Sequence, residues 1–494
     1  MRSRSLMRGL IALLMTVSLL GCGHHGRMQE VIDAYDGGDF SLAAEVMRPV
    51  WEKYRDDDVD AVIFDLEQGA IARAAGQFNQ SIIAFNESWD RMSPYLDIAA
   101  DVKVSEEVAA ALTNQSIRTY RGTTYDRIMA NTFQALNYLQ INEPQKAGVE
   151  FVRARNWQND AVERERKRIK EENDLWRKSN DAQNTGYDPD RSLGDSGFRA
   201  QLRQAYRAAA QFKGYADYEI PVATWLRGLF YLGRGDPSDI EQARQCFMRV
   251  AGMLPEPDGL MIAADMQMAE QIASGAPMPR MCYVLMESGI APSRGEIRLD
   301  IPLFLDGVPY VGAAFATLEY HGNEVTGFTA TRTGDGVASA SGESHSSSMI
   351  TDMDSIVSKD FNNRLGGMII ATLVSSASKA AMTYALKQGL GNLGALAGVL
   401  YQVGMNSADL RTWETLPKRF YCARIPMPAT GGEIAITMAD GTQIPPLKPP
   451  SDLISIVYIK TTAAGTAPSV RTFGISRQRP FVIPRQRPFV IPRQ

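Results

Sequence analysis

The sequence predicts an α+β protein with a helical front half and a β-rich back half. Four stretches before residue 275 share one helical pattern of small and large residues. After Pro279 the chain changes to short runs rich in β-branched and aromatic residues that end at Gly or Pro. A third observation, a short apolar segment that ends at Cys22, predicts that this protein is exported.

The N-terminus has the parts of an export signal. Three arginines precede an apolar region at 10–20 that is too short for a comfortable membrane span. Its end, Leu-Leu-Gly-Cys at 19–22, resembles a bacterial lipobox, in which the cysteine takes a diacylglycerol and becomes the mature N-terminus. We therefore expect a signal peptide at 1–21, a lipidated N-terminus at 22–27, and lipidation of Cys22 as the membrane anchor. An ordinary signal peptide with a chance cysteine is the alternative.

The residue after the cysteine and the composition predict where the body works. Gly23 stands where an aspartate would indicate inner-membrane retention, so we expect the outer membrane, with the body facing the periplasm. Removing residues 1–21 takes the formal charge from −4 to −7, which gives no electrostatic footprint for nucleic acid. Cys282 and Cys422 both lie in strand-like runs and are the favoured disulfide pair; three buried free thiols, with Cys246, are the alternative.

The repeat pattern begins with a turn, followed by a small residue and an apolar residue four positions later. The stretches are GGDFSLAAEVM, AGQFNQSIIAF, INEPQKAGVEF and SDIEQARQCFM. The small residues are Ala43, Ser81, Ala147 and Ala243, and the large ones are Met47, Phe85, Phe151 and Phe247. This resembles the second helix of a tetratricopeptide repeat, with irregular spacing. We expect an α-solenoid of degenerate tetratricopeptide-like repeats over 28–275; a generic helical bundle is the alternative.

The helix expected around 125–139 carries a polar stripe. Arg127, Asn131, Gln134 and Tyr138 follow one another at helical spacing, beside an apolar arc. Such a stripe predicts a protein-binding groove for an extended peptide; the alternative is a solvated face or a cap on a neighbouring helix. The run ERERKRIKEEN from 163 alternates in sign and predicts an exposed helix with many ion pairs.

The back half predicts a β-rich domain over 280–470. Seven strand-like runs lie on both sides of a helical insertion at about 351–407, which we expect to form a hairpin. In EIRLDIP the alternation of Ile297, Leu299 and Ile301 with charged neighbours predicts a sheet with one wet face. The end of the chain, 471–494, repeats RQRPFVIP and predicts an extended Arg/Pro-rich tail.

Several motifs together resemble a family of uncharacterised bacterial outer-membrane lipoproteins. They are the lipobox, YRGTTYDRIMANTFQALNYL, WLRGLFYL, YVLMESGIAP and ADLRTWETLP, and they span nearly the whole chain. The resemblance implies an envelope location, a repeat-like helical front and a β-rich back, and no established catalytic residue. In the last motif we expect Asp409 and Arg411 to pair across a turn while Trp413 packs; a recognition patch is the alternative.

The stretch GLGNLGALAG at 389–398 matches a dinucleotide-binding pattern. That function needs a buried strand before the first glycine, but helix-forming residues precede it. A membrane span is disfavoured by the polar residues inside it. Gly391, Gly394 and Gly398 instead continue a small-residue stripe, which predicts close helix packing and a possible homo-oligomer contact.

The sequence contains no convergent catalytic set. HExxH, paired CxxC and G-x-S-x-G motifs are absent, and we expect no enzyme, cofactor or metal. The leading hypothesis is a lipid-anchored scaffold that binds a periplasmic or cell-wall protein through its helical repeats. One alternative is an oligomeric or membrane-inserting envelope component that uses helices at 365–404. The other is a cell-wall or polysaccharide-processing enzyme.

Overall fold

The computed structural model describes residues 24–57, 59–96, 119–159, 161–183, 186–305, 308–333, 343–405 and 408–475. Helices form the first part and three β-sheets the second, so the predicted α+β class is confirmed. The expected signal peptide, the lipidation residue Cys22 and the RQRPFVIP repeats lie outside the described residues. Residues 24–27, expected in the lipidated N-terminus, already form the first turn of helix α2.

The front of the chain is a series of packed helices. Their bounds are α2 His24–Asp36, α3 Phe40–Tyr54, α4 Ala61–Ala74, α5 Phe78–Met92, α7 Thr124–Gln140, α8 Pro144–Asn159, α12 Pro221–Arg234, α13 Pro237–Ala251 and α14 Asp258–Ala273. Helix α7 starts with a capping box between Thr123 and Asp126, which pairs two backbone N–H groups that the helix leaves free. The successive pairs α2–α3, α4–α5, α7–α8 and α12–α13 pack side by side.

The small and large residues of the four repeats lie in the core, as their pattern predicts. All eight side chains are buried. Beside Ser81, a Cβ placed on Gly69 would lie 2.6 Å from the Phe85 ring, so only glycine lets α4 approach α5 this closely. The Ser81 hydroxyl donates to the Gly69 carbonyl at 2.6 Å. The small residue and the glycine thus bring two backbones together, and the aromatic ring fills the space beside them.

A five-stranded sheet covers the inner helices α4, α7 and α12. Its order is β11-β10-β1-β7-β6, from β1 Met281–Ser288, β6 Ser348–Asp352, β7 Arg419–Pro426, β10 Ile454–Thr461 and β11 Ser469–Ile475. Only the β1–β10 pair in this sheet is parallel. Trp225 of α12 meets Tyr283 of β1 with ring centroids 5.6 Å apart.

The Arg/Pro-rich tail, predicted to begin at residue 471, begins later. Arg471 to Ile475 belong to strand β11 and complete it.

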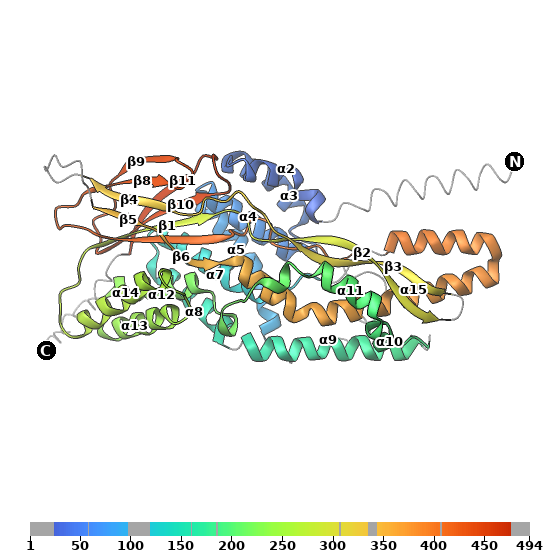
Figure 1. Ribbon diagram of the computed structural model, residues 1–494. Helices are drawn as coiled ribbons and strands as arrows, with labels where there is room; N and C mark the ends of the chain where they lie inside the picture. The colour runs from blue at the N-terminus through green and yellow to red at the C-terminus, as the bar shows by residue number, and fades with distance from the viewer. Residues whose placement is uncertain are drawn as a thin grey trace, which may run out of the picture.

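A second sheet covers the other face of the first. It runs β5-β4-β8-β9, from β4 Phe328–Thr333, β5 Ser344–Ser346, β8 Glu433–Met438 and β9 Gln443–Leu447. Alternate residues of β1 face the two sides: Tyr283 joins the core under the helices, and Val284 joins the core between the sheets. The body thus has four layers, namely outer helices, inner helices and two sheets (Figure 1). One hydrophobic cluster runs from Met28 to Ile475, so the two halves of the chain share a core.

An elongated arm extends from this body (Figure 1). It consists of the ribbon β2 Ser293–Leu305 and β3 Val308–Glu319 with helices α9 Ala161–Gln183, α10 Pro189–Gly194, α11 Ser196–Ala205 and α15 Met353–Met405. The predicted wet face is confirmed, because Leu299 and Ile301 are buried while their neighbours Arg298 and Asp300 are exposed. The ion pairs expected on α9 are present, for example between Lys167 and Glu171.

The inserted helical segment is uninterrupted from Met353 to Met405. Its ribbon turns back on itself at the far end of the arm (Figure 1), so the expected hairpin is one continuous helix that folds back. Among the helices described here, none is long and apolar enough to cross a membrane.

Candidate functional site

The polar stripe of α7 lies inside the protein. Arg127, Asn131, Gln134 and Tyr138 are all at most 9% exposed, because α7 is enclosed between outer helices and the sheet. Asn131 donates to Glu150 of α8 at 2.7 Å, and Gln134 donates to the Ile82 carbonyl of α5 at 3.2 Å. The interpretation of this stripe as an open peptide groove is wrong, since its side chains are buried against the neighbouring helices α5 and α8. These side chains instead connect neighbouring helices.

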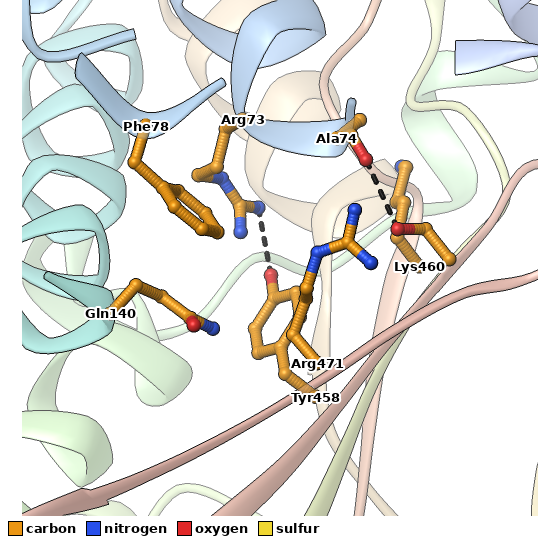
Figure 2. A pocket seen from close by; sticks show the side chains of 8 residues that line it. Arg73, Ala74, Phe78, Gln140, Tyr458, Lys460 and Arg471 are labelled. Carbon is orange, nitrogen blue, oxygen red and sulfur yellow. Dashed lines mark hydrogen bonds between the residues drawn. The ribbon is translucent and has the colours of Figure 1, made fainter. Parts of the chain in front are cut away.

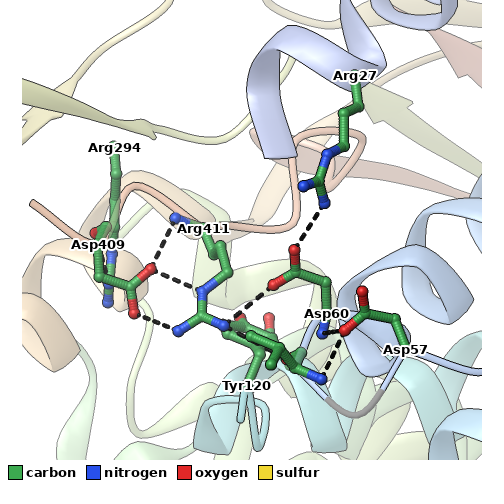
Figure 3. A network of polar contacts seen from close by, with 9 residues as sticks. Arg27, Asp57, Asp60, Tyr120, Arg294, Asp409 and Arg411 are labelled. Carbon is green, nitrogen blue, oxygen red and sulfur yellow. Dashed lines mark hydrogen bonds and ion pairs between the residues drawn. The ribbon is translucent and has the colours of Figure 1, made fainter. Parts of the chain in front are cut away.

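Asp409 and Arg411 pair as predicted and form the centre of a buried network (Figure 3). The Arg411 guanidinium donates to both Asp409 carboxylate oxygens at 2.8 Å, and it donates to Asp60 at 3.1 Å. Asp60 also accepts from Arg27 of α2 at 2.9 Å. Burial alone would raise the pKa of Asp409, but the charge and hydrogen bonds of Arg411 together with the charge of Arg294 outweigh burial and lower it. The motif thus ties the segment before β7 to the start of α4.

Trp413 packs against the repeat helices, as the sequence predicts. It is 1% exposed, and its ring meets Phe85 and Phe133 at centroid distances of 6.1 and 5.8 Å. Its indole N–H donates to Thr415 at 3.0 Å. The alternative of a recognition patch is wrong for this motif, because neither Trp413 nor Arg411 is accessible to a partner.

Buried carboxylates hold the next part of the same segment. Glu67 of α4 accepts from the backbone N–H of Glu414 and from the hydroxyl of Thr415, at 2.5 and 2.6 Å. Nδ1 of His25, in the first turn of α2, lies 3.1 Å from Glu414. Burial raises the pKa of Glu414, and the neighbouring His24 counteracts that shift. The start of α2 is therefore fixed to the centre of the body.

The predicted disulfide is wrong. Cys282 and Cys422 are free and buried, as is Cys246. They lie on adjacent strands, but Cys422 pairs with Leu285 and Cys282 pairs with Ile425, so the thiols point to opposite faces of the sheet. One thiol packs under the helices and the other between the two sheets, which is incompatible with disulfide geometry.

The glycine-rich stretch lies within helix α15. Gly391, Gly394 and Gly398 have helical backbone, and the surroundings of their side-chain positions lie outside the described residues. A helix runs unbroken through the whole G-x-G-x-x-G pattern. Because the dinucleotide fold needs a strand, a turn and a helix there, the pattern is not such a site.

No group of three His, Cys, Asp or Glu side chains in the described ranges is arranged to hold a metal ion. His321 lies 3.1 Å from the Ser293 hydroxyl, but among the described residues no carboxylate hydrogen-bonds its other ring nitrogen, so the third group that orients a catalytic histidine is not present there.

A small cavity lies where the α4–α5 turn and the end of α7 meet strands β10 and β11 (Figure 2). Its volume is about 20 Å³, close to the space of one water molecule. The lining residues are Arg73, Ala74, Phe78, Gln140, Tyr458, Lys460, Ser469 and Arg471. Three of them are cationic, which makes this cavity the strongest candidate for a binding site in the described part of the chain.

The cations around the cavity share one buried carboxylate. Arg73 and the Tyr458 hydroxyl both bond to Glu287 of β1, and Arg73 also donates to Tyr458 at 2.7 Å. Nζ of Lys460 lies 3.8 Å from Glu287, beyond hydrogen-bond distance. Lys460 is 3% exposed, and burial lowers its pKa to about 8 although Glu287 counteracts the shift.

Arg471 lies at the edge of the cavity and is only half-buried. Its Nη1 donates to the Val470 carbonyl at 3.1 Å. Gly76, with φ of +79°, leaves the space that the guanidinium occupies, because a Cβ there would lie 2.6 Å from Nη2. The α4–α5 turn thus needs a glycine both for its backbone conformation and for the approach of Arg471.

Sequence reasoning missed this cavity because its residues are far apart in the chain. Arg73 belongs to a repeat helix, and Arg471 was assigned to the tail. A signal was present in the strands: Glu287 and Lys460 are single charges in the apolar runs MCYVLMES and ISIVYIKT. A charge in a strand that is buried on both faces needs a partner, so these two residues could have been predicted to meet.

The comparisons with known proteins leave the family open. No family model matches this chain, and no curated protein matches it. The chain is similar to a solved tetratricopeptide repeat protein from Parabacteroides merdae, with 15% identity over 51% of this chain and 100% of that one, at a TM-score of 0.14. A likeness this low carries no argument, and the fold described above depends on the helix pairs and sheets themselves.

Proposed function

We propose that this protein is a non-catalytic scaffold of the cell envelope, anchored in the outer membrane by a lipid on Cys22, that binds a periplasmic or cell-wall protein. The observation that carries the proposal is the position of the exposed apolar side chains. On the repeat helices these are Leu42, Ile83, Val149, Val152, Met248 and Leu260, each 45–56% exposed. They lie on α3, α5, α8, α13 and α14, whereas the inner helices α4, α7 and α12 have none among their described residues.

The interior supports a scaffold over an enzyme. The inner helices use their polar side chains for contacts within the protein, as with Asn131 and Gln134. The cationic cavity, at about 20 Å³, is far smaller than the several hundred Å³ that small-molecule substrates usually need. The outer helices offer a partner one accessible surface with exposed apolar side chains. Apolar side chains that are exposed there are suited to burial against another protein.

The N-terminal anchor also fits this role. Helix α2 begins at His24, two residues after Cys22, and His25 contacts Glu414 at the centre of the body. An acyl chain on Cys22 would consequently hold the body close to the bilayer surface, since the link has almost no length.

Site-specific crosslinking in cells tests the scaffold. A photo-crosslinking amino acid at Val152 or Met248 is expected to capture the same protein partner, because both positions lie on outer helices. The matched control is Gln443, an exposed position on β9, which should capture no such partner. If Val152 and Met248 capture nothing beyond the control, the outer helices are not a partner surface and the proposal fails.

Labelling with a radioactive fatty acid tests the anchor separately. We expect incorporation into the full chain and its loss in Cys22→Ser, with the protein then released from the membrane fraction. Incorporation that persists in Cys22→Ser would contradict the anchor and would leave the scaffold proposal to the crosslinking result.

A further inference from the structure

We propose that the cavity between Arg73, Lys460 and Arg471 binds a carboxylate group of the partner polypeptide, either an acidic side chain or a chain terminus. This inference rests on the proposed scaffold function and names the chemistry by which the partner is recognised. The cavity lies between the α4–α5 turn, the end of α7 and the strands β10 and β11 (Figure 2).

The balance of charge at the cavity favours an anion. Three cations, Arg73, Lys460 and Arg471, are close to the cavity, and the nearby anions are Glu287 and Asp36. Asp36 acts on Lys460 through its charge, but no hydrogen bond joins the two side chains. The site thus has one positive charge more than its described surroundings balance. A carboxylate is a monoanion and neutralises that charge.

Lys460 supplies an unsatisfied donor at the cavity wall. Its ammonium group is buried and has no hydrogen-bond partner within the described residues. A buried ammonium that lacks hydrogen bonds is costly, and a carboxylate oxygen would satisfy it. Glu287 does not do so, because Arg73 and Tyr458 both donate to its Oε1, and its Oε2 lies 3.8 Å from the lysine, beyond hydrogen-bond distance.

Arg471 supplies the donors at the edge. Its guanidinium is held over Gly76, and within the described residues it donates to the backbone carbonyl of Val470 rather than to an acid. Guanidinium groups bind carboxylates through two parallel N–H donors, which is the strongest arrangement of this kind. Because both residues line the cavity, we assign one oxygen of the carboxylate to Lys460 and the other to Arg471.

The size of the cavity selects the group that enters it. A volume of about 20 Å³ is close to the space of one water molecule, so a ligand must place a single oxygen inside and leave its remaining atoms at the edge or in solvent. A carboxylate at the end of a side chain or of a polypeptide has this shape. A phosphate, with four oxygens around one centre, is larger and usually carries more than one negative charge at neutral pH.

Calorimetric titration of the full chain, purified in detergent at constant ionic strength, tests the proposal. The probes are N-acetyl-trialanine as the free acid, its C-terminal amide, and N-acetyl-Ala-Glu-Ala amide. We expect at least one of the two acids to bind at least tenfold more tightly than the neutral amide. Binding of only the free acid assigns the chain terminus, and binding of only the glutamate peptide assigns the side chain.

Two variants and a matched control complete the test. Arg471→Gln and Lys460→Met should each lower the affinity for the acid at least tenfold, whereas Arg199→Gln, which removes an exposed charge on α11, should leave it unchanged. Lys460→Met keeps the length of the side chain, so folding is expected to survive, and thermal unfolding verifies this. Equal affinity for acid and amide, tighter binding of inorganic phosphate, or unchanged binding by both folded variants would overturn the proposal.

The crosslinking experiment separates this failure from failure of the scaffold. If Val152 still captures its partner in Arg471→Gln with undiminished yield, the scaffold stands and the carboxylate site is wrong. A second outcome is that crosslinking at Val152 captures no partner in the otherwise unaltered chain, while the acid probe still binds in the titration. The cavity then recognises a carboxylate that does not belong to a scaffold partner.

Discussion

The body and the arm of this protein bury their residues in different ways. In the body, strands β1 and β10 are buried at every position, because inner helices cover one face of the sheet and a second sheet covers the other. In the arm, β2 alternates between buried and exposed residues, because only one face of the ribbon is covered. The arm also exposes Phe304 and Tyr310, at 42% and 66%. The sheet of the body is therefore stabilised by packing on both of its faces, whereas the ribbon of the arm is stabilised by packing on one face.

The two regions share one type of ion-pair network, in which a buried arginine contacts two carboxylates. Arg411 of the body contacts Asp409 and Asp60, and Arg364 of the arm contacts Glu165 and Asp360. In each case the arginine joins segments that are distant in the chain. What differs is the amount of apolar packing around the pair, so matched substitutions in the two regions separate the effect of packing from the effect of charge.

The largest difference is expected from tryptophan truncation. Trp413→Ala removes a side chain from the shared core beside Phe85 and Phe133, and should lower the free energy of unfolding by about 3–5 kcal/mol. Trp176→Ala in α9 removes a ring that packs in a small cluster with Ala371 and Ile370, and should cost clearly less. Urea unfolding of both variants measures the two losses. Equal losses would show that body and arm are packed equally well.

Removal of the shared arginines should have the next largest effect. Arg411→Met removes both guanidinium donors from the partly buried Asp409, while Asp60 keeps Arg27 at 2.9 Å, and we expect a cost on the order of 3 kcal/mol. Arg364→Met leaves Asp360 and Glu165, but Glu165 still has Arg168 at 3.7 Å. Hydrogen exchange should show that the Arg364 variant opens α9 and α15 alone, whereas the Arg411 variant destabilises the whole body. Uniform opening in both variants would contradict a separable arm.

The sequence predicted the parts of this fold better than their arrangement. The buried residues of the repeats, the strands before and after the insertion, and the pairing of Asp409 with Arg411 follow local rules of spacing and turn chemistry. In contrast, the burial of Arg127 and Asn131 depends on which elements cover α7. Nothing in the α7 sequence indicates that α5 and α8 enclose its polar stripe, since that depends on how the three helices pack.

The same limit explains the errors in the back half. Strand β11, SVRTFGI, has few apolar residues and runs into the arginine-rich repeat, so composition assigned part of it to a tail. The disulfide between Cys282 and Cys422 was favoured because both lie in strands, but strand register decides which face each thiol occupies. Register between distant strands is set by the completed sheet and cannot be derived from either strand alone.

The contributions of two buried carboxyl groups, one in the body and one in the arm, to the free energy of unfolding should change with pH in opposite directions. Burial raises the pKa of Asp65 in the body to about 7, although Arg91 counteracts it. A carboxyl group whose pKa is raised by folding contributes fully to stability at a pH below 3.8, its pKa in the unfolded chain. This contribution is lost as the pH rises through about 7, its pKa in the folded chain. For Glu165 in the arm, burial raises the pKa, but the charges of Arg364 and Arg168 and the hydrogen bond from Thr124 together outweigh burial, and the pKa falls to about 2. Its contribution is present above pH 4.5 and is lost as the pH falls toward 2.

Urea unfolding against pH, with Asp65→Asn and Glu165→Gln as the variants, measures both contributions. The difference between the unaltered chain and Asp65→Asn should fall from pH 4 to 7, by at most about 1.4 kcal/mol per pH unit. The difference in the free energy of unfolding between the unaltered chain and Glu165→Gln should instead decrease as the pH is lowered from 4.5 to 2. A Glu165→Gln variant that follows the same pH trend as Asp65→Asn would refute the assignment of charge to the arm.

The smallest effect, and the one with the most informative sign, is expected at Gly394 in α15. Glycine in a helix interior is about 1 kcal/mol less favourable than alanine, and leucine is nearly as good a helix former as alanine. If Gly394 is exposed, Gly394→Leu therefore stabilises the chain by somewhat less than 1 kcal/mol. If the small-residue stripe of Gly391, Gly394 and Gly398 is a helix contact, the larger side chain separates the backbones, and the same substitution destabilises the chain or lowers its oligomeric state.

We expect the second result, measured by light scattering and urea unfolding together. Gly366→Leu is the matched control, because Gly366 lies in the same helix with no atom within 4 Å of the Cβ position. This control should gain stability and keep its oligomeric state. The sign of the difference between the two leucine variants then decides whether the arm carries a packed helix contact or an open helical surface, since helix propensity is common to both and cancels.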